Sequence, residues 1–369
     1  MGFAQLVSWG ISYYLIGIFG EKMAAELAWT RPVVYGGFSF ALVVMGGVSP
    51  LIGRAIDRHG GRYVLAGGSV CCAVGCALLA RSQTVFGYYA AWMLLGLAMR
   101  STLYEAAFAA LVRIGGRQAK RPIAKITLLG GLASTCFWPI GHTLSETFGW
   151  RGALNVYALV ALAIIPLYLA IPRGRFPTEV ESGLSPPLAS ALPAAKSVAI
   201  LYALIAMLSN GLNSALSAHM VGILSELGLA AALAVTASSL RGIGQSAARL
   251  AEVLFGGRLH PIVLNLAAAC VMPLCLVVGL ASGRSLVAAM AFTFFYGAST
   301  GLLTITRGTL PLVLFDVTTY GAYVGKLLVP SFLFTAASPL LFAVVIERHT
   351  AQGALGLALV LALGLLAVD

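Results

Sequence analysis

Two arginines lie inside long apolar stretches of this 369-residue sequence. Arg100 is near the middle of the stretch 84–112, and Arg241 is near the middle of the stretch 229–255. A guanidinium group can hold a carboxylate or a phosphate through two parallel hydrogen bonds. The two arginines therefore predict an anion-binding site, with structural pairing, such as Arg100 with Glu105, as the alternative. Residues five apart are about 140° apart around a helix, so that pair would be poor within one helix.

Other polar side chains fall at similar depths in the apolar stretches. Tyr104 is one helical turn from Arg100 and shares its face of the expected helix. The remaining candidates are aromatic or amide residues: Tyr13, Tyr14, Trp138, Tyr296, Asn210 and Asn213. Such residues either contact a substrate or form hydrogen bonds between helices. We predict that they line a substrate site together with the two arginines.

Glu105 is the only acid deep inside an apolar stretch, so it is the candidate proton carrier. An internal alignment at an offset of 201 places Gly96 over Gly297, and Glu105 over Thr306, next to Arg307. We expect Glu105 and Arg307 to form a charge pair that closes the cytoplasmic side. The alternative is that Arg307 binds helix-end carbonyls or Asp316, while Glu105 meets Arg100 or the loop 53–62.

The elements that position these residues follow from the composition. Apolar residues make up 60% of the chain and charged residues 9%, against about 25% charged in a soluble domain. This excludes a water-soluble protein, a disordered chain and a nucleic-acid binder, and it makes the lipid bilayer the solvent. Segments of about 20 apolar residues predict membrane-spanning helices. Twelve are expected: 2–19, 32–53, 63–80, 84–112, 125–147, 151–171, 197–220, 229–255, 262–280, 285–312, 326–346 and 351–368.

Basic residues predict the orientation of these helices. Loops on one side hold 14 Lys and Arg residues and loops on the other hold 6, so the richer side is cytoplasmic, as are both termini. The longest polar interruption is 173–196, with six expected helices on each side. We therefore predict an N-terminal bundle over 1–172, a cytoplasmic linker over 173–196 and a C-terminal bundle over 197–369. Halves of equal length and helix number indicate an internal duplication.

The loop between the second and third expected helices carries the most specific motif. Residues 53–62 read GRAIDRHGGR, in which Asp57 ends a helix beside Arg58 and Arg62. An acid at that place can pair with basic residues or cap another helix. The segment resembles the signature loop of the major facilitator superfamily, G-x-L-x-D-R-x-G-R-R, although Gly61 stands where the pattern has a basic residue. The sequence Gly149-Trp150-Arg151 also resembles the family's usual start of the sixth helix.

The resemblance implies an all-α membrane protein with two pseudo-symmetric six-helix bundles that rock about a central site. It implies that Asp57, Arg58 and Arg62 control the conformational cycle. An arginine in the middle of the eighth helix, here Arg241, resembles the monocarboxylate and oxalate carriers. Trp92 stands where the drug-exporter pattern places an arginine, which argues against proton-coupled drug efflux.

Together these features predict a secondary transporter of a bacterial inner membrane. Its expected substrate is a small organic anion such as a monocarboxylate, carried with protons. The alternatives are an exporter of amphiphilic or toxic compounds and a membrane sensor that transports nothing. No phosphate-binding Gly-Lys-Thr loop, nucleophile or metal-ligand pattern is present in the sequence, so we expect no enzyme activity, cofactor or metal. The expected partners are the small-molecule substrate, protons and the lipid bilayer, and the protein is expected to be monomeric.

Overall fold

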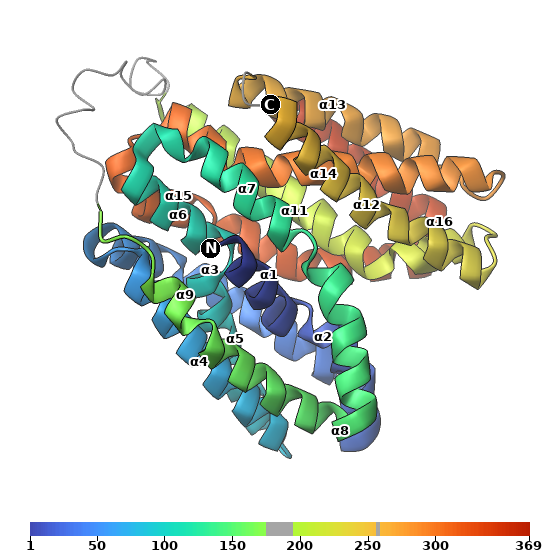
Figure 1. The fold of residues 1–369 in the computed structure, drawn as a ribbon. Helices are drawn as coiled ribbons and strands as arrows, with labels where there is room; N and C mark the ends of the chain where they lie inside the picture. The colour runs from blue at the N-terminus through green and yellow to red at the C-terminus, as the bar shows by residue number, and fades with distance from the viewer. Residues whose placement is uncertain (175–194, 256–258) are drawn as a thin grey trace. The chain divides into compact units, whose positions relative to one another are not determined.

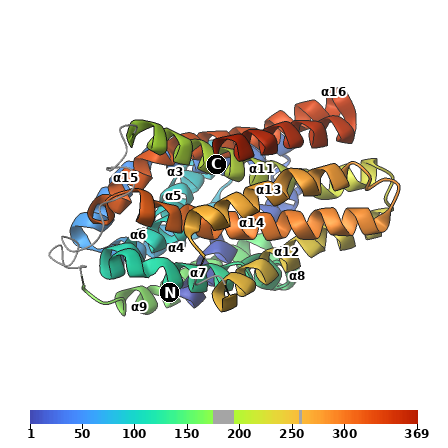
Figure 2. The same cartoon turned by 90° about the horizontal axis from the view of Figure 1, so that it is seen from above.

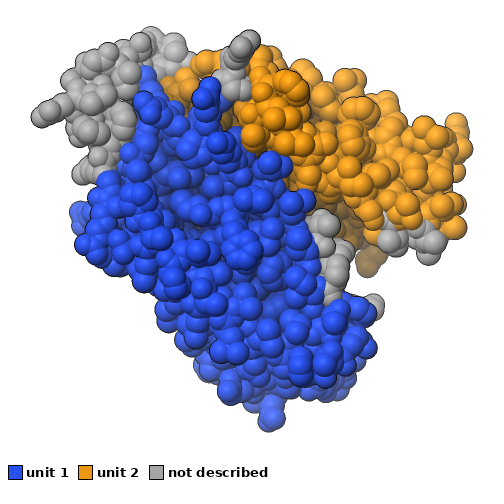
Figure 3. Space-filling model, viewed as in Figure 1, with its two compact units in different colours: residues 1–186, 315–329 blue, residues 187–314, 330–369 orange. Residues whose placement is uncertain are grey.

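The computed structural model describes residues 1–174, 195–255 and 259–369, and within these ranges all regular secondary structure is helical (Figure 1, and Figure 2 from a second direction). Nine helices in the described residues are long and apolar enough to cross a membrane. The expectation of an all-helical membrane protein is therefore confirmed. The chain divides into two compact units, shown in different colours in Figure 3.

Unit 1 contains residues 1–186 and 315–329. Its helices are α1 (Gly2–Ser8), a π-helix η1 (Trp9–Tyr13), α2 (Leu15–Leu27), α3 (Arg31–His59), α4 (Gly61–Arg81), α5 (Val85–Thr102), α6 (Tyr104–Gly115), a 3-10 turn η2 (Gly116–Ala119), α7 (Lys120–Gly130), α8 (Ala133–Ala163), α9 (Ile165–Leu169), a second 3-10 turn η5 (Val317–Thr319) and α15 (Tyr320–Leu327). The last two come from late in the sequence. They show that unit 1 is not one continuous segment of chain.

Unit 2 contains residues 187–314 and 330–369. Its helices are α11 (Ala195–Glu226), α12 (Ala231–Phe255), α13 (Pro261–Gly279), α14 (Leu286–Leu314) and α16 (Val329–Val368). α14 packs against both α12 and α13, and α11 contacts α12 and α14. The long helices α8 and α16 contain non-helical backbone at Gly149 and at His349 and Thr350. These positions match the loops expected between 147 and 151 and between 346 and 351.

The expectation of one unbroken helix over 84–112 is wrong at Leu103. This residue has an extended backbone (φ −78°, ψ −172°) and separates α5 from α6. In a regular helix the N–H of Ala106 would donate to the carbonyl of Thr102. Here it donates to the carbonyl of Leu103, so the Thr102 carbonyl loses its helical hydrogen bond. The buried side chain of Gln5 supplies the missing donor, since its Nε2 donates to Thr102 O over 2.6 Å. A side chain from α1 thus satisfies the backbone that the break leaves open.

Glycines bring helices into backbone contact at equivalent places in the two units. A Cβ on Gly96 of α5 would lie 2.5 Å from Ala41 O of α3. A Cβ on Gly297 of α14 would lie 2.0 Å from Arg241 O of α12. Small residues permit such close approach of helices in membranes. The two glycines that the internal alignment pairs thus pack in the same way, as an internal duplication predicts.

Candidate functional site

Arg241 projects from α12 into a group of neutral polar side chains in unit 2. Its Nη2 donates to Asn213 Oδ1 of α11 over 2.7 Å, and its Cζ lies 5.4 Å from the ring centre of Tyr296 in α14. The ring is itself fixed, because Tyr296 is fully buried and its hydroxyl donates to Leu212 O over 2.9 Å. Within the part of the chain that the structure describes, no Asp or Glu forms an ion pair with Arg241. The structure thus brings together three of the residues expected at the substrate site.

Asn210 lies one turn from Asn213 on α11 and repeats the arrangement. Its Oδ1 accepts a hydrogen bond from Arg307 Nη1 of α14. Its Nδ2 donates to Ser331 Oγ of α16 over 2.8 Å. The face of α11 that carries the two asparagines therefore meets a guanidinium group at each of two successive turns. Arg307, which we expected in a gate, thus contacts a residue that we expected in the substrate site.

Three of the expected aromatic residues form a cluster in unit 1. Tyr13 and Tyr14 have ring centres 5.6 Å apart at the junction of η1 and α2. Trp9 contacts both of them, and it also lies 4.9 Å from the ring of Tyr104. Sequence reasoning missed Trp9, although its four-residue spacing from Tyr13 was a signal. Trp138 lies in α8, and its side chain is outside the described residues.

Arg100 has a different environment from Arg241. Its side chain is 2% exposed, and its Nε donates to Ser49 Oγ of α3 over 2.8 Å. Its Nη2 approaches Ser49 O at 3.3 Å. Tyr104 follows the break at Leu103, so the expected one-turn relation to Arg100 does not hold, because the extended backbone interrupts the helical phase. Tyr104 instead donates its hydroxyl to Thr127 O of α7 over 3.2 Å.

Asp57 caps the beginning of α15. Its Oδ1 accepts from the N–H of Gly321 over 3.0 Å, and its Oδ2 accepts from the N–H of Ala322 over 2.7 Å. A carboxylate at a helix N-terminus satisfies unpaired N–H groups and meets the positive end of the helix dipole. The capping is helped by close packing, since a Cβ on Gly53 would lie 1.9 Å from Gly321 O. The signature loop therefore holds a helix from the second half of the sequence within unit 1.

Arg113 holds the other side of the signature loop, and sequence reasoning did not single it out. From the last turn of α6 it donates to Asp57 O over 3.0 Å, to Arg58 O over 3.4 Å and to Gly174 O over 2.9 Å. A cation at the C-terminal end of α3 is favourable because the carbonyls there carry partial negative charge. The side chain of Arg58 is exposed, and Arg62 lies with its Cζ 5.6 Å from the ring of Tyr63.

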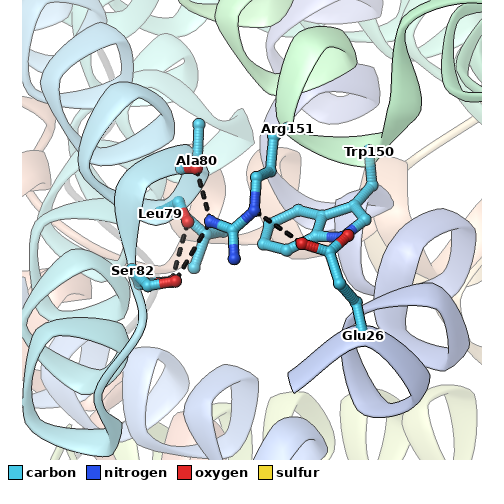
Figure 4. A network of polar contacts seen from close by, with 6 residues as sticks. All are labelled: Glu26, Leu79, Ala80, Ser82, Trp150 and Arg151. Atoms are coloured by element: carbon cyan, nitrogen blue, oxygen red, sulfur yellow. Dashed lines mark hydrogen bonds and ion pairs between the residues drawn. The ribbon is translucent and has the colours of Figure 1, made fainter. Parts of the chain in front are cut away.

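The sequence Gly149-Trp150-Arg151 forms a second group of polar contacts between helices of unit 1 (Figure 4). Arg151 Nε donates to Glu26 Oε1 of α2 over 2.8 Å, and its Nη1 donates to Ala80 O and Ser82 O, where α4 ends. Trp150 Nε1 donates to the other oxygen of Glu26 over 2.5 Å. One arginine thus ties α8 to α2 and α4.

The expected pair of Glu105 and Arg307 spans the two units. Glu105 lies in the first turn of α6 in unit 1, and Arg307 lies on α14 in unit 2. The pair stays a prediction.

Comparisons with known proteins place the chain among membrane transporters. The chain is 26% identical to monocarboxylate transporter 11 of Mus musculus over 167 residues, which is 42% of this chain and 36% of that protein. The match therefore spans about a third of the relative's length. Among solved structures, the human organic anion transporter MFSD10 (TETRAN) has a TM-score of 0.74 and 18% identity, with 100% of this chain and 97% of that chain covered.

Two further structures share the fold at 12% identity. The transporter FucP in the outward conformation has a TM-score of 0.70 over 99% of this chain and 96% of its own. The proton:xylose symporter XylE bound to 6-bromo-6-deoxy-D-glucose has a TM-score of 0.75 over 99% of this chain and 92% of its own. Residues 1–325 match the family described as Major Facilitator Superfamily. The chain belongs to the Major Facilitator Superfamily of membrane transporters.

Proposed function

We propose that this transporter moves a small organic anion and that Arg241 binds its carboxylate. The observation that carries the proposal is the neutral surroundings of Arg241, which contacts the Asn213 amide and the Tyr296 ring. A cation near the bilayer centre costs about 2.5–3.5 kcal/mol on insertion scales. A bound anion would supply the opposite charge that the described residues around Arg241 do not.

The contacts of Arg241 also suit this role geometrically. Asn213 engages Nη2 alone, which leaves the other guanidinium nitrogens for a forked contact with a carboxylate. The Tyr296 ring supports the cation through a contact at 5.4 Å from its centre to Arg241 Cζ. Because two different helices fix the cation before substrate arrives, little side-chain entropy is lost on binding.

The comparisons support an anionic substrate. The mouse relative is named a monocarboxylate transporter, and one structural neighbour is an organic anion transporter. We further propose alternating access between the two six-helix bundles, 1–172 and 197–369, and proton symport with Glu105 as the proton carrier. Because basic residues concentrate on one side, we propose that both termini are cytoplasmic. A bacterial inner membrane is the location that we propose with it.

The test is uptake into proteoliposomes of radiolabelled acetate, lactate, pyruvate, benzoate and oxalate, each with and without an inward proton gradient. The wild type is compared with Arg241→Lys and Arg241→Gln. The matched control is Arg284→Gln, which removes an exposed arginine from a turn of the same unit. We expect both Arg241 variants to lose saturable uptake and the control to keep it, since an ammonium group cannot replace a planar fork.

Other outcomes separate the alternatives. Uptake of none of these anions together with efflux of amphiphilic cations would favour the exporter. Transport of nothing by a correctly folded protein would favour the sensor. Unchanged anion uptake by Arg241→Gln would overturn the assignment of Arg241 while leaving anion transport intact.

A further inference from the structure

Arg100 lies where α15 packs on α3. Three residues at four-residue spacing form the α3 side of this contact: Ser49, Gly53 and Asp57. The α15 side consists of Gly321 and Gly325. A Cβ on Gly325 would lie 2.8 Å from Ser49 O and 3.4 Å from Arg100 Nη2. Gly325 therefore lies directly against both the guanidinium group of Arg100 and its acceptor on α3.

The hydrogen bonds of Arg100 do not involve α15. Both run from α5 to Ser49 of α3, and α15 contributes no atom to them. What α15 adds is burial, because it packs over a side chain that is only 2% exposed. Arg100 Nη1 is buried and has no hydrogen-bond partner in the described residues. No carboxylate forms an ion pair with Arg100 in those residues either, although Glu105 and Tyr320, the first residue of α15, interact with its charge favourably.

We propose that Arg100 is a positioning residue that opposes the docking of α15 on α3 and so keeps this docking reversible. Covering a charged group without giving it a new hydrogen bond costs free energy, whereas water would satisfy Nη1 once α15 moves away. Asp57 acts in the opposite direction, since its two hydrogen bonds to α15 exist only in the docked arrangement. The stability of the contact is the difference between these two effects.

The connectivity of the chain explains why reversibility matters. α15 belongs to unit 1, but only Leu328 separates it from α16, which continues into unit 2. Any rearrangement of unit 2 relative to unit 1 must therefore either detach α15 from α3 or bend the chain near Leu328. If nothing opposed the glycine contact and the Asp57 cap, α15 would be difficult to detach from α3. The proposal gives Arg100 a part in the transport cycle that is separate from the substrate contact assigned to Arg241.

The test is hydrogen–deuterium exchange of the full-length protein in lipid nanodiscs, followed by mass spectrometry of peptides that cover 315–329. It needs no substrate, so its result is independent of whether the protein carries anions. Arg100→Met removes the charge and keeps the length of the side chain, and Arg100→Lys keeps the charge. Arg100→Gln is the second neutral variant, and melting temperatures identify any variant that does not fold. Arg249→Gln, at an equally buried arginine of unit 2, is the matched control.

We expect exchange in α15 to become about tenfold slower in Arg100→Met and Arg100→Gln, because docked molecules become more abundant. Exchange in Arg100→Lys and Arg249→Gln should stay close to wild type. Asp57→Asn should change exchange in the opposite direction and make it faster. Faster exchange in the neutral Arg100 variants would show that Arg100 anchors α15, and unchanged exchange would show that it has no part in docking. Either result overturns the proposal.

Discussion

Replacing Asn213 by aspartate tests the anion site from inside the protein. Asn213→Asp would place a carboxylate where an amide oxygen now lies 2.7 Å from Arg241 Nη2. The side chains differ little in size, so the change adds a charge without a steric cost. The new carboxylate would occupy Arg241 in the way that we propose for a substrate. We therefore expect a transporter that is blocked by its own side chain.

The size of the effect follows from the geometry. Two unit charges about 4 Å apart attract by about 4 kcal/mol at an effective dielectric constant of about 20, and by about 1 kcal/mol in water. A substrate must overcome this attraction to reach Arg241. Since about 1.4 kcal/mol corresponds to a tenfold change, affinity should fall by between about fivefold and about a thousandfold.

The assay is the concentration dependence of uptake in proteoliposomes, with the carboxylate that the wild type transports from the panel given above. Asn213→Ala is the control, because it removes the hydrogen bond to Arg241 without adding a charge. Its KM should lie closer to the wild-type value than that of Asn213→Asp. Equal KM values for the alanine and aspartate variants would refute the reasoning, since charge would then have no effect at this position.

Three further predictions concern the contacts of unit 1 and the expected gate. Asp57→Asn should lower the maximal transport rate about 2- to 30-fold and change KM little, because a weakened helix cap costs about 0.5–2 kcal/mol; equal rates for variant and wild type would contradict this. Arg151→Gln should lower stability by about 1–3 kcal/mol in thermal unfolding, and Glu26→Gln should lower it less, because Arg151 then keeps its bonds to two carbonyls. Exchanging the charges of Glu105 and Arg307 should partly restore the transport that either single change removes, and a double variant no better than the single ones would exclude the pair.

The sequence pattern was sufficient for the elements that depend on local composition. Apolar length predicted the helices, and the turn at Gly149 appears where the pattern placed a loop. The break at Leu103 could not be predicted in this way, because neither Gly nor Pro marks it. The carbonyl that it frees is satisfied by Gln5, which lies 97 residues away in the sequence. A break that depends on a distant side chain leaves no local signal.

The types of residue at the candidate site were predictable from the sequence. Which of these residues contact one another was not. Arg100 and Arg241 look alike in sequence, since each is an arginine within an apolar helix. They differ in where the side chain points: Arg100 is bound to Ser49 of α3, and Arg241 is bound to Asn213 beside Tyr296. The direction of a side chain around a helix becomes meaningful only when the neighbouring helices are known. The place of α15 in unit 1 has the same origin, because only tertiary packing assigns it there.

The contact between Asp57 and α15 also sets an order of events during synthesis. The chain is made from its N-terminus, and early segments fold first. Asp57 lies 264 residues before its partner Gly321. The α3 surface around Gly53 therefore stays uncovered while most of the protein is being made and inserted. Unit 1 becomes complete only after residues 187–314 of unit 2 have left the ribosome, so its final assembly is a late step in the biogenesis of this transporter.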